Sequence, residues 1–290
     1  MPFPPLFNGL ETPECVQLRS ELFEIAWPVL ENRIQDVLRE ANRQTLEEVD
    51  SFLKAAEERD GAKIPAGFII TGPNIASQDL LFEQLAEALC KGGERAACVR
   101  LRSTEAPNLK ATLKKIIRDA SSARDVREGD DADVSVGRDG RKYLDYDLEA
   151  LNVSLQMQPS RRVVVAFQDS EAFDNALLTD LIQLFHSWHD RVQFSVLFGI
   201  ATSVELFQAR LLKSTSRHLY GAQFDVVQAD SVLDSVFKAA VAGSQAVLRL
   251  GPSLLRSLVE RQQEQVAGIQ VFISSLKVSF CATMSLSAGC

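Results

Sequence analysis

One turn of the chain lies where a phosphate-binding loop would lie. It reads GPNIASQD over residues 72–79, after a short apolar run and before a helical pattern. A strand, a turn that begins with Gly and a helix are the setting of the phosphate-binding loop, whose pattern is Gly-x-x-x-x-Gly-Lys-Ser/Thr. Gly72 matches the first glycine, but Ser77, Gln78 and Asp79 stand at the second glycine, the lysine and the hydroxyl residue.

Each replacement removes part of the chemistry that a nucleotide site needs. The lysine of the pattern supplies a cation to the β- and γ-phosphates, and Gln78 is neutral. The hydroxyl binds magnesium, whereas Asp79 brings a negative charge to a place meant for phosphate. Ser77 can cap the following helix, and Asp79 suits the positive end of its dipole. The loop then satisfies with its own groups the anion site that a nucleotide fills elsewhere, which predicts no bound ATP and no other cofactor.

The end of the clearest strand leads to the same prediction. This strand is expected at 163–167, and Gln168 and Asp169 follow it. An ATPase of this layout ends the strand with Asp-Glu, one carboxylate for magnesium and one to polarise water. The magnesium carboxylate is missing, and Asp169 alone is a helix-capping or loop residue. We therefore expect no catalytic residue and no enzymatic activity. An ordinary strand–turn–helix that never bound nucleotide is the other interpretation.

A second candidate site is a cationic stripe on a predicted helix. Lys110, Lys114 and Arg118 recur every four residues, with Lys115 beside them, and apolar residues define the opposite face. One interpretation is a solvated outer face. The other is contact with DNA phosphates inside a larger assembly, where partners supply the remaining cations.

No metal site is predicted. His186 and His189 are three residues apart on a predicted helix, so both could face one metal ion, but only the neighbouring Asp190 could add a ligand. A site needs three or four ligands, so surface histidines near a helix end are the favoured interpretation. The five cysteines are scattered and form no CxxC pair, so neither a zinc ribbon nor a disulfide framework is indicated.

Composition and charge narrow the class of protein. The 290 residues are 46% apolar and 24% charged, which is ordinary for a soluble globular protein with a sizeable core. The formal net charge of -8 argues against a free-standing nucleic-acid binder, because neutralising phosphates takes a surplus of Lys and Arg. No run approaches the roughly 18 apolar residues that a membrane helix needs, and the first residues lack the pattern of a signal peptide. A reducing intracellular compartment fits best, and no membrane segment is expected.

Strand-like and helical segments alternate through the middle of the chain. The strand candidates are short apolar runs at 67–71, 97–101, 163–167, 194–200 and 224–227. The helical patterns between them lie at 80–89, 109–117, 177–189 and 206–214. This alternation predicts an α/β fold with a parallel five-stranded sheet that helices cover on both faces.

Three parts of the chain follow from this pattern. Residues 1–63 are expected to form an N-terminal helical segment and residues 64–229 the α/β domain. A stretch at about 121–142 is rich in Asp, Arg, Gly and Ser, which predicts a mobile insertion. Residues 230–290 are expected to form a small helical lid domain. Its helical patterns lie at 232–241, 252–265 and 269–278.

Two features mark the N-terminal helical segment. Thr12 followed by Pro13 is a good N-cap and first-turn pair, so the helix should begin there. Pro28 is expected to break or kink the helix, because proline lacks the N–H that the helical ladder uses.

Several segments, taken together, resemble origin recognition complex subunit 3. Their order and spacing carry the resemblance over nearly the whole chain, because no single motif is decisive. The segments are FNG at 7–9, ETPE at 11–14, residues 64–89, VVVAFQDSEAF at 163–173 and LFGIATS at 197–203.

The resemblance implies an AAA+-like domain of the P-loop NTPase type that has lost nucleotide chemistry. It implies a structural subunit of the complex that marks replication origins in the nucleus, with subunits 2, 5 and 6 as partners. It further implies contact with duplex DNA only within the complex, with no membrane and no small-molecule substrate. The alternative is an active AAA+ ATPase of the clamp-loader kind with an atypical phosphate loop, and Gln78 and Gln168 argue against it.

The end of the chain departs from the family pattern. The family continues into a long helical insertion and a winged-helix domain, whereas this chain ends in a tail of small residues, CATMSLSAGC at 281–290. The expectation is therefore an N-terminal part of the family, truncated at the C-terminus. Much of the subunit 6 contact and the winged-helix contact with DNA would lie in the missing part.

Overall fold

A computed structural model gives the fold of the chain. It describes residues 5, 7–57, 62–72, 75–91, 96–121, 134–136, 142–156, 162–226, 229–239, 253, 256–257, 260, 271–278 and 281. The chain forms two compact units, one of Gln44–Val226 and one that combines Met1–Arg43 with Val227–Cys290.

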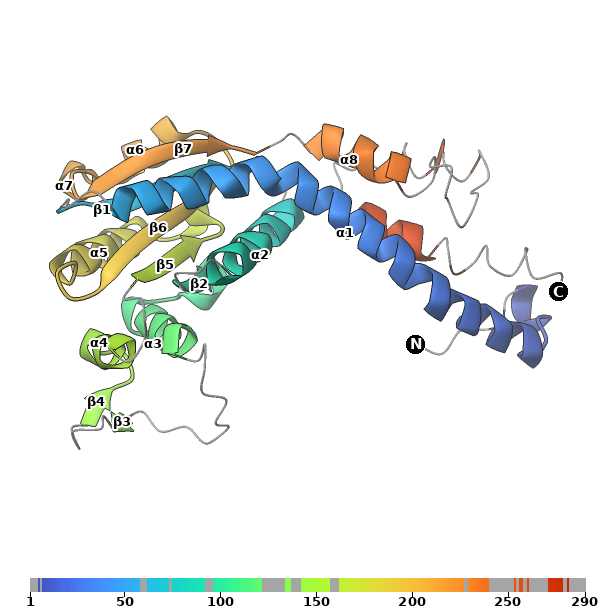
Figure 1. Cartoon of the computed structure of the whole chain (residues 1–290), viewed down its shortest axis with the longest axis horizontal. Helices are drawn as coiled ribbons and strands as arrows, with labels where there is room; N and C mark the ends of the chain where they lie inside the picture. The colour runs from blue at the N-terminus through green and yellow to red at the C-terminus, as the bar shows by residue number, and fades with distance from the viewer. Residues whose placement is uncertain are drawn as a thin grey trace. The chain divides into compact units, whose positions relative to one another are not determined.

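Five strands of the larger unit form one parallel sheet (Figure 1). The order across the sheet is β2-β5-β6-β1-β7, and every adjacent pair is parallel. The predicted parallel five-stranded sheet is therefore confirmed. The bounds of the strands are β1 Ile64–Ile70, β2 Ala97–Leu101, β5 Arg162–Phe167, β6 Gln193–Ile200 and β7 Leu219–Asp225.

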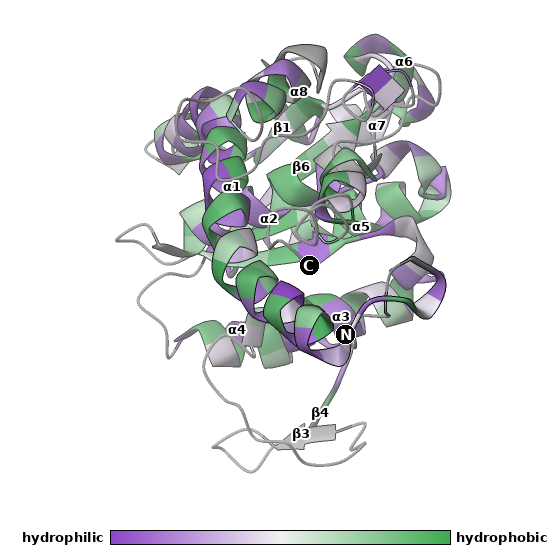
Figure 2. Ribbon diagram, turned by 90° about the vertical axis from the view of Figure 1, so that its right-hand side faces the viewer, coloured by the Kyte–Doolittle hydropathy of each residue, from purple (hydrophilic) through white to green (hydrophobic). Residues whose placement is uncertain are grey.

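Helices cover both faces of this sheet. The central strands β5 and β6 are buried almost throughout, and most residues of β6 are hydrophobic (Figure 2). A strand covered on both faces is continuously apolar, and the run at 163–167, within β5, is the clearest strand in the sequence. The helices that contribute to the two cores are α2 Ile75–Lys91, α3 Leu109–Ser121, α4 Leu148–Gln156, α5 Asn175–Ser187, α6 Val204–Arg210 and the end of α1 Pro13–Glu57.

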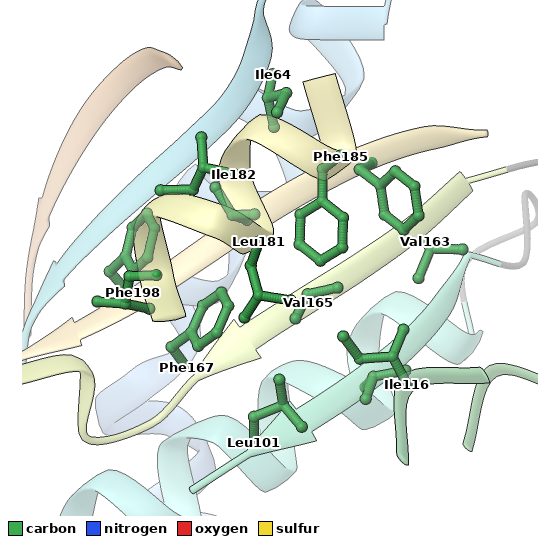
Figure 3. Close-up of a cluster of buried hydrophobic side chains, with 14 of the residues drawn as sticks. Ile64, Leu101, Ile116, Val163, Val165, Phe167, Leu181, Ile182, Phe185 and Phe198 are labelled. Atoms are coloured by element: carbon green, nitrogen blue, oxygen red, sulfur yellow. The ribbon is translucent and has the colours of Figure 1, made fainter. Parts of the chain in front are cut away.

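The core on the first face is built around stacked phenylalanines (Figure 3). Phe167 stacks on Phe198 with ring centroids 5.3 Å apart, and Phe198 stacks on Phe68 at 5.6 Å. Phe185 of α5 stacks on Phe194 of β6 at 4.3 Å. These contacts join α5 and three neighbouring strands into one packed layer, to which α3 and α4 add buried leucines and isoleucines.

The second face of the sheet is covered by α2 and the end of α1. Leu81, Phe82 and Leu85 of α2 belong to one buried cluster with Val49 and Leu53 of α1. The strand side chains in this cluster are those that alternate with the residues of the first core, namely Ile69, Val164, Ala166, Leu197 and Phe224. The period of two along each strand thus divides its side chains between the two cores.

A glycine lets the carboxyl end of β6 approach its neighbours closely. A Cβ atom at Gly199 would overlap the backbone carbonyl oxygen of Gln168 and would lie 2.8 Å from a ring carbon of Phe82. No side chain fits between these groups. Gly199 therefore brings the end of β6 against Gln168, the residue that directly follows β5.

Some elements differ from the predicted ones. β7 spans Leu219–Asp225 rather than 224–227, because this edge strand is mostly exposed and its first half carries polar and small residues. The pattern at 206–214 forms two short helices, α6 and α7 Lys213–Ser216. The helix α4 was not predicted.

A short antiparallel pair lies at one end of the predicted insertion. β3 Val134–Val136 pairs with β4 Lys142–Leu144. The remaining residues at 122–133 and 137–141 lie outside the described residues. The mobility of the insertion therefore stays a prediction.

The long helix α1 begins as predicted. The backbone N–H of Cys15 donates to Oγ1 of Thr12 over 3.4 Å, which confirms the N-cap. The helix is not broken at Pro28. Pro28 and Glu24 are both exposed, so water can satisfy the carbonyl oxygen that the proline leaves without an N–H donor.

The smaller unit has its own packed contacts. The guanidinium of Arg19 pairs with the carboxylate of Glu11 at 2.7 Å, and both side chains are 3% exposed. The ammonium of Lys277 lies 5.2 Å from the centroid of the buried Trp27 ring. Cys15 is disulfide-bonded, which the spacing of the cysteines did not indicate.

Helices follow the last strand of the sheet in the described residues. α8 Ala229–Phe237 and a helix at 271–278 match two of the three predicted helices. The predicted helix at 252–265 lies almost wholly outside the described residues. The predicted division at residues 63 and 229 stays a prediction. The two compact units divide within α1, after Arg43, and before Val227. Within the described ranges, no helix combines the length and apolar character that crossing a membrane requires.

Candidate nucleotide cleft at the carboxyl edge of the sheet

The residues that the sequence singled out lie at one edge of the sheet. In a parallel sheet the carboxyl ends of neighbouring strands meet, and ligands of α/β proteins bind at that edge. Leu101 at the end of β2 is paired with Phe167 at the end of β5, and Phe167 with Phe198 near the end of β6. The turn that would carry a phosphate follows β1, which pairs with β6. The fold therefore brings the degenerate loop and the end of β5 to the same edge.

Gln78, at the lysine position of the pattern, is turned onto its own loop. Its side-chain Nε2 donates to Oγ1 of Thr71 over 2.6 Å and to the carbonyl oxygen of Gly72 over 3.0 Å. The side chain is buried, with a relative exposure of 4%. Gln78 thus ties the start of α2 to the end of β1 instead of reaching outward. The predicted cap at Ser77 is wrong, because α2 already begins at Ile75 and Ser77 lies within the helix. Asp79 likewise lies beyond the first turn, which contains no acidic residue.

Asp79, at the magnesium-hydroxyl position, is paired with an arginine. Its Oδ1 lies 2.9 Å from Nη2 of Arg102, the residue that follows β2. The same guanidinium donates through Nε to Oε1 of Gln168 over 2.9 Å. The two positions that would hold magnesium in an active site are therefore joined to each other by a cation of the chain itself.

Asp169 is held by the neighbouring turn. Its carboxylate accepts the backbone N–H of Ser103 at 2.8 Å and also the Ser103 hydroxyl. The predicted role as a loop residue is consistent with these contacts. The next residue, Ser170, donates its hydroxyl to the carbonyl oxygen of Gly199 over 2.6 Å. The end of β5 is thus tied on one side to the turn after β2 and on the other to β6.

Glu171 closes the edge at the end of β6. Its carboxylate accepts the backbone N–H groups of Ala201 and Thr202 over 3.1 Å and 3.2 Å, together with the Thr202 hydroxyl. Arg210 of α6 donates to the carbonyl oxygen of Glu171 over 2.7 Å. The backbone N–H groups of Ala201 and Thr202, directly after β6, are therefore also hydrogen-bonded within the chain.

A magnesium–nucleotide complex does not fit these residues. The phosphate lysine is replaced by an amide that binds the loop itself, and the metal positions are bound to the Arg102 guanidinium. A divalent cation there would meet a fixed positive charge, and phosphate would meet the carboxylate of Asp79. No catalytic step is assigned to this cleft.

The cationic stripe lies on the exposed face of α3, opposite a buried apolar face. Each cation has a partner within the chain. Lys110 lies 4.6 Å from the centroid of the Tyr146 ring, and Lys114 pairs with Asp145 at 2.6 Å. The other two cations pair with acids of their own neighbourhood, Lys115 with Glu105 and Asp119, and Arg118 with Asp119. These acids reduce the positive charge of the stripe, and contact with DNA stays a prediction.

One of the two histidines considered for a metal site, His186, packs against a third histidine. His186 stacks on His218, with ring centroids 3.9 Å apart. Among the described residues, no group of three or more His, Cys, Asp or Glu side chains is placed to hold a metal ion. Desolvation and, second, the neighbouring His186 lower the pKa of His218 below its ordinary value of 6.5.

Several residues of the cleft were not singled out from the sequence. Arg102, Ser103 and Glu171 carry most of its ion pairs and hydrogen bonds. A positional signal existed for all three, because each lies one to four residues beyond a predicted buried strand. Their hydrogen-bond partners depend on which strands are neighbours in the sheet. The local sequence pattern predicts the strands but not their order.

Comparison with known proteins identifies the family. The family model described as "Origin recognition complex (ORC) subunit 3 N-terminus" matches residues 1–282. The chain belongs to this family. It is 23% identical over 309 aligned residues to origin recognition complex subunit 3 of Homo sapiens and 22% identical to that of Bos taurus. In both cases 96% of this chain is covered, and the chain spans only 43% of the length of the relative.

Solved structures agree with the fold. The chain resembles one in the structure of Drosophila ORC bound to AT-rich DNA and Cdc6, with a TM-score of 0.79 and 20% sequence identity. It also resembles one in the structure of Drosophila ORC bound to DNA, with a TM-score of 0.76 and 20% identity. These matches cover 97% of this chain and 44% and 46% of the Drosophila chains. The fold is AAA+-like, as the resemblance predicted.

The stacked pair of histidines predicts a pH dependence. The pKa of His218 is lower in the folded state than the ordinary value, so its contribution to stability is complete above that value. This contribution is lost as the pH falls through the ordinary value to the lower pKa of the folded state.

The chain has three histidines, so NMR titration can follow His218 directly. His186→Gln should raise the pKa of His218 only in part, because desolvation remains. An unchanged pKa in this variant would contradict the electrostatic coupling, and His189→Gln is the matched control.

Proposed function

We propose that this chain is a non-catalytic, structural subunit of the origin recognition complex. It helps to assemble the ring that binds origin DNA and initiates DNA replication in the nucleus. Its partners are other subunits of the complex, especially subunits 2, 5 and 6. It contacts duplex DNA only within that complex, and it uses no cofactor and no small-molecule substrate.

One observation carries the non-catalytic part of this proposal. The Arg102 guanidinium joins the two positions at which an active cleft would hold magnesium, Asp79 and Gln168. The alternative of an active clamp-loader type ATPase would need these positions to be available to a metal. Membership in the subunit 3 family supports the structural role, and the Drosophila structures, whose chains share the fold, are complexes with DNA.

The proposed role is tested by assembly. The tagged full chain is co-expressed with candidate subunits 2, 5 and 6. The masses of the purified complexes are then measured by native mass spectrometry. We expect a stoichiometric complex that contains one copy of the 32.0 kDa chain. Recovery of the chain as a monodisperse monomer, without any of these subunits, would contradict the proposal.

Restoring the missing lysine should not restore nucleotide binding. In Gln78→Lys the cation for phosphate returns, but Asp79 and Gln168 still leave magnesium unheld. Titration calorimetry with Mg-ATP should detect no binding in the micromolar range, either for the wild type or for this variant. Gln78→Met is the control for loss of the hydrogen bonds to Thr71 and Gly72, and both variants should melt at a lower temperature than the wild type. A micromolar dissociation constant would refute the proposal.

The cationic stripe is proposed to contact phosphates within the assembled complex. Replacing Lys110, Lys114 and Arg118 with Ala should weaken DNA binding about equally across sequences. It should also flatten the salt dependence by roughly one unit of slope for each cation that no longer neutralises a phosphate. The fold should survive, because these side chains lie on the exposed face of α3.

A charge-matched triple variant separates local contact from net charge. Arg39, Arg43 and Lys54 of α1 each pair with a carboxylate three or four residues away along the same helix. Their replacement with Ala removes the same charge elsewhere on the chain. If the stripe variant and the control have the same affinity and salt slope, measured by fluorescence anisotropy of the complex, the stripe is only a solvated face.

A further inference from the structure

One arginine holds together three elements at the edge of the sheet. The guanidinium of Arg102, directly after β2, lies 2.9 Å from the carboxylate of Asp79 on α2. It also donates over 2.9 Å to Gln168, directly after β5. In a nucleotide site of the phosphate-loop type, the residues at the positions of Asp79 and Gln168 are those that hold magnesium. A positive charge of the chain therefore lies between the groups that would share a metal.

We propose that Arg102 is a built-in cation that takes the place of the metal and keeps the cleft in one arrangement without a nucleotide. The guanidinium suits this role, because it stays charged at any physiological pH and its planar fork can bind two acceptors at once. The inference rests on the proposed non-catalytic function. It adds the group that keeps α2, β2 and β5 in place when no ligand is used.

The contribution of Arg102 to the stability of the fold comes mainly from its hydrogen bond to the buried amide of Gln168. The ion pair is half-exposed, with side-chain exposures of 48% for Arg102 and 38% for Asp79, and such pairs stabilise a fold only weakly. Gln168 is 3% exposed, and its Nε2 has no hydrogen-bond partner among the described residues. The side chain of Gln168 is thus held through the Oε1 bond with Arg102. Removing the guanidinium would leave the whole buried amide without a partner, which is costly.

The stability of two variants tests this assignment. Arg102→Met removes the guanidinium and keeps an unbranched side chain, and the melting temperature of the full chain should fall by roughly 5 °C. Lys54→Met is the matched control, because its 2.7 Å pair with Asp50 has similar exposures of 59% and 38% but involves no buried amide. The control should shift the melting temperature by less than about 1 °C. Equal shifts for the two variants would overturn the proposal.

A competition with Mn²⁺ tests whether Arg102 occupies a metal position. Gln168→Asp restores a carboxylate at the end of β5, but Arg102 should still exclude a divalent cation. In Gln168→Asp/Arg102→Met the oxygens at 79 and 168 become available, and millimolar MnCl2 should raise the melting temperature by roughly 3 °C. The wild type and Gln168→Asp should not respond. Adding Asp79→Asn to the double variant should abolish the response.

Each outcome of the Mn²⁺ experiment either supports or contradicts the proposal that Arg102 occupies a metal position. A Mn²⁺ response of Gln168→Asp as large as that of the double variant would show that Arg102 excludes nothing. If the folded double variant does not respond to Mn²⁺, the proposal that residues 79 and 168 flank a metal position is wrong. If circular dichroism shows that the double variant does not fold, the comparison of Arg102→Met with Lys54→Met decides alone. These measurements use the isolated chain, so a failure of the chain to assemble with other subunits would be seen separately.

Discussion

The pairing of β2 with β5 is the constraint on which the rest of the cleft depends. One residue beyond the last pair of these strands, the backbone N–H of Gln168 donates to the carbonyl oxygen of Leu101 over 2.9 Å. This bond puts the side chains of Arg102 and Gln168 next to each other. A slip of one residue would turn Arg102 to the other face of the sheet, since side chains alternate along a strand. The ion pair with Asp79 on α2 would then be broken as well.

Close packing at β6 sets the opposite side of the cleft. Gly199 brings the backbone of β6 against the carbonyl of Gln168, so that the Ser170 hydroxyl reaches the Gly199 carbonyl oxygen over 2.6 Å. Glu171 can then receive the N–H groups of Ala201 and Thr202. The backbone groups that end these strands are thus satisfied by side chains from the adjacent loop. The buried pair of Ser170 and Gly199 needs such a bond, because buried polar groups without partners are costly.

The sheet could be predicted from the sequence, but the cleft could be predicted only in part. Continuous apolar runs such as that of β5 identify a strand with two covered faces, whereas the mixed residues of the edge strand β7 gave only its last part. Comparison with a known motif marked Gln78 and Gln168 as departures from it. It could not find Arg102, because the motif contains no residue of β2. The partner of Arg102 follows from the strand order β2-β5-β6-β1-β7, and that order is set by packing over the whole unit.

A cleft whose polar groups bind one another has little reason to change shape. A ligand shifts a conformational equilibrium only by its different affinity for two states, and a nucleotide finds no free cation or metal site at Gln78, Asp79 or Gln168. If the chain binds no nucleotide, as proposed, the arrangement around Arg102 is the same at any nucleotide concentration. Under the proposed role, neighbouring subunits of the complex would meet a surface that does not change with the nucleotide concentration. A constant surface is a useful property for a structural subunit, because the neighbours' changes are then made against a fixed partner.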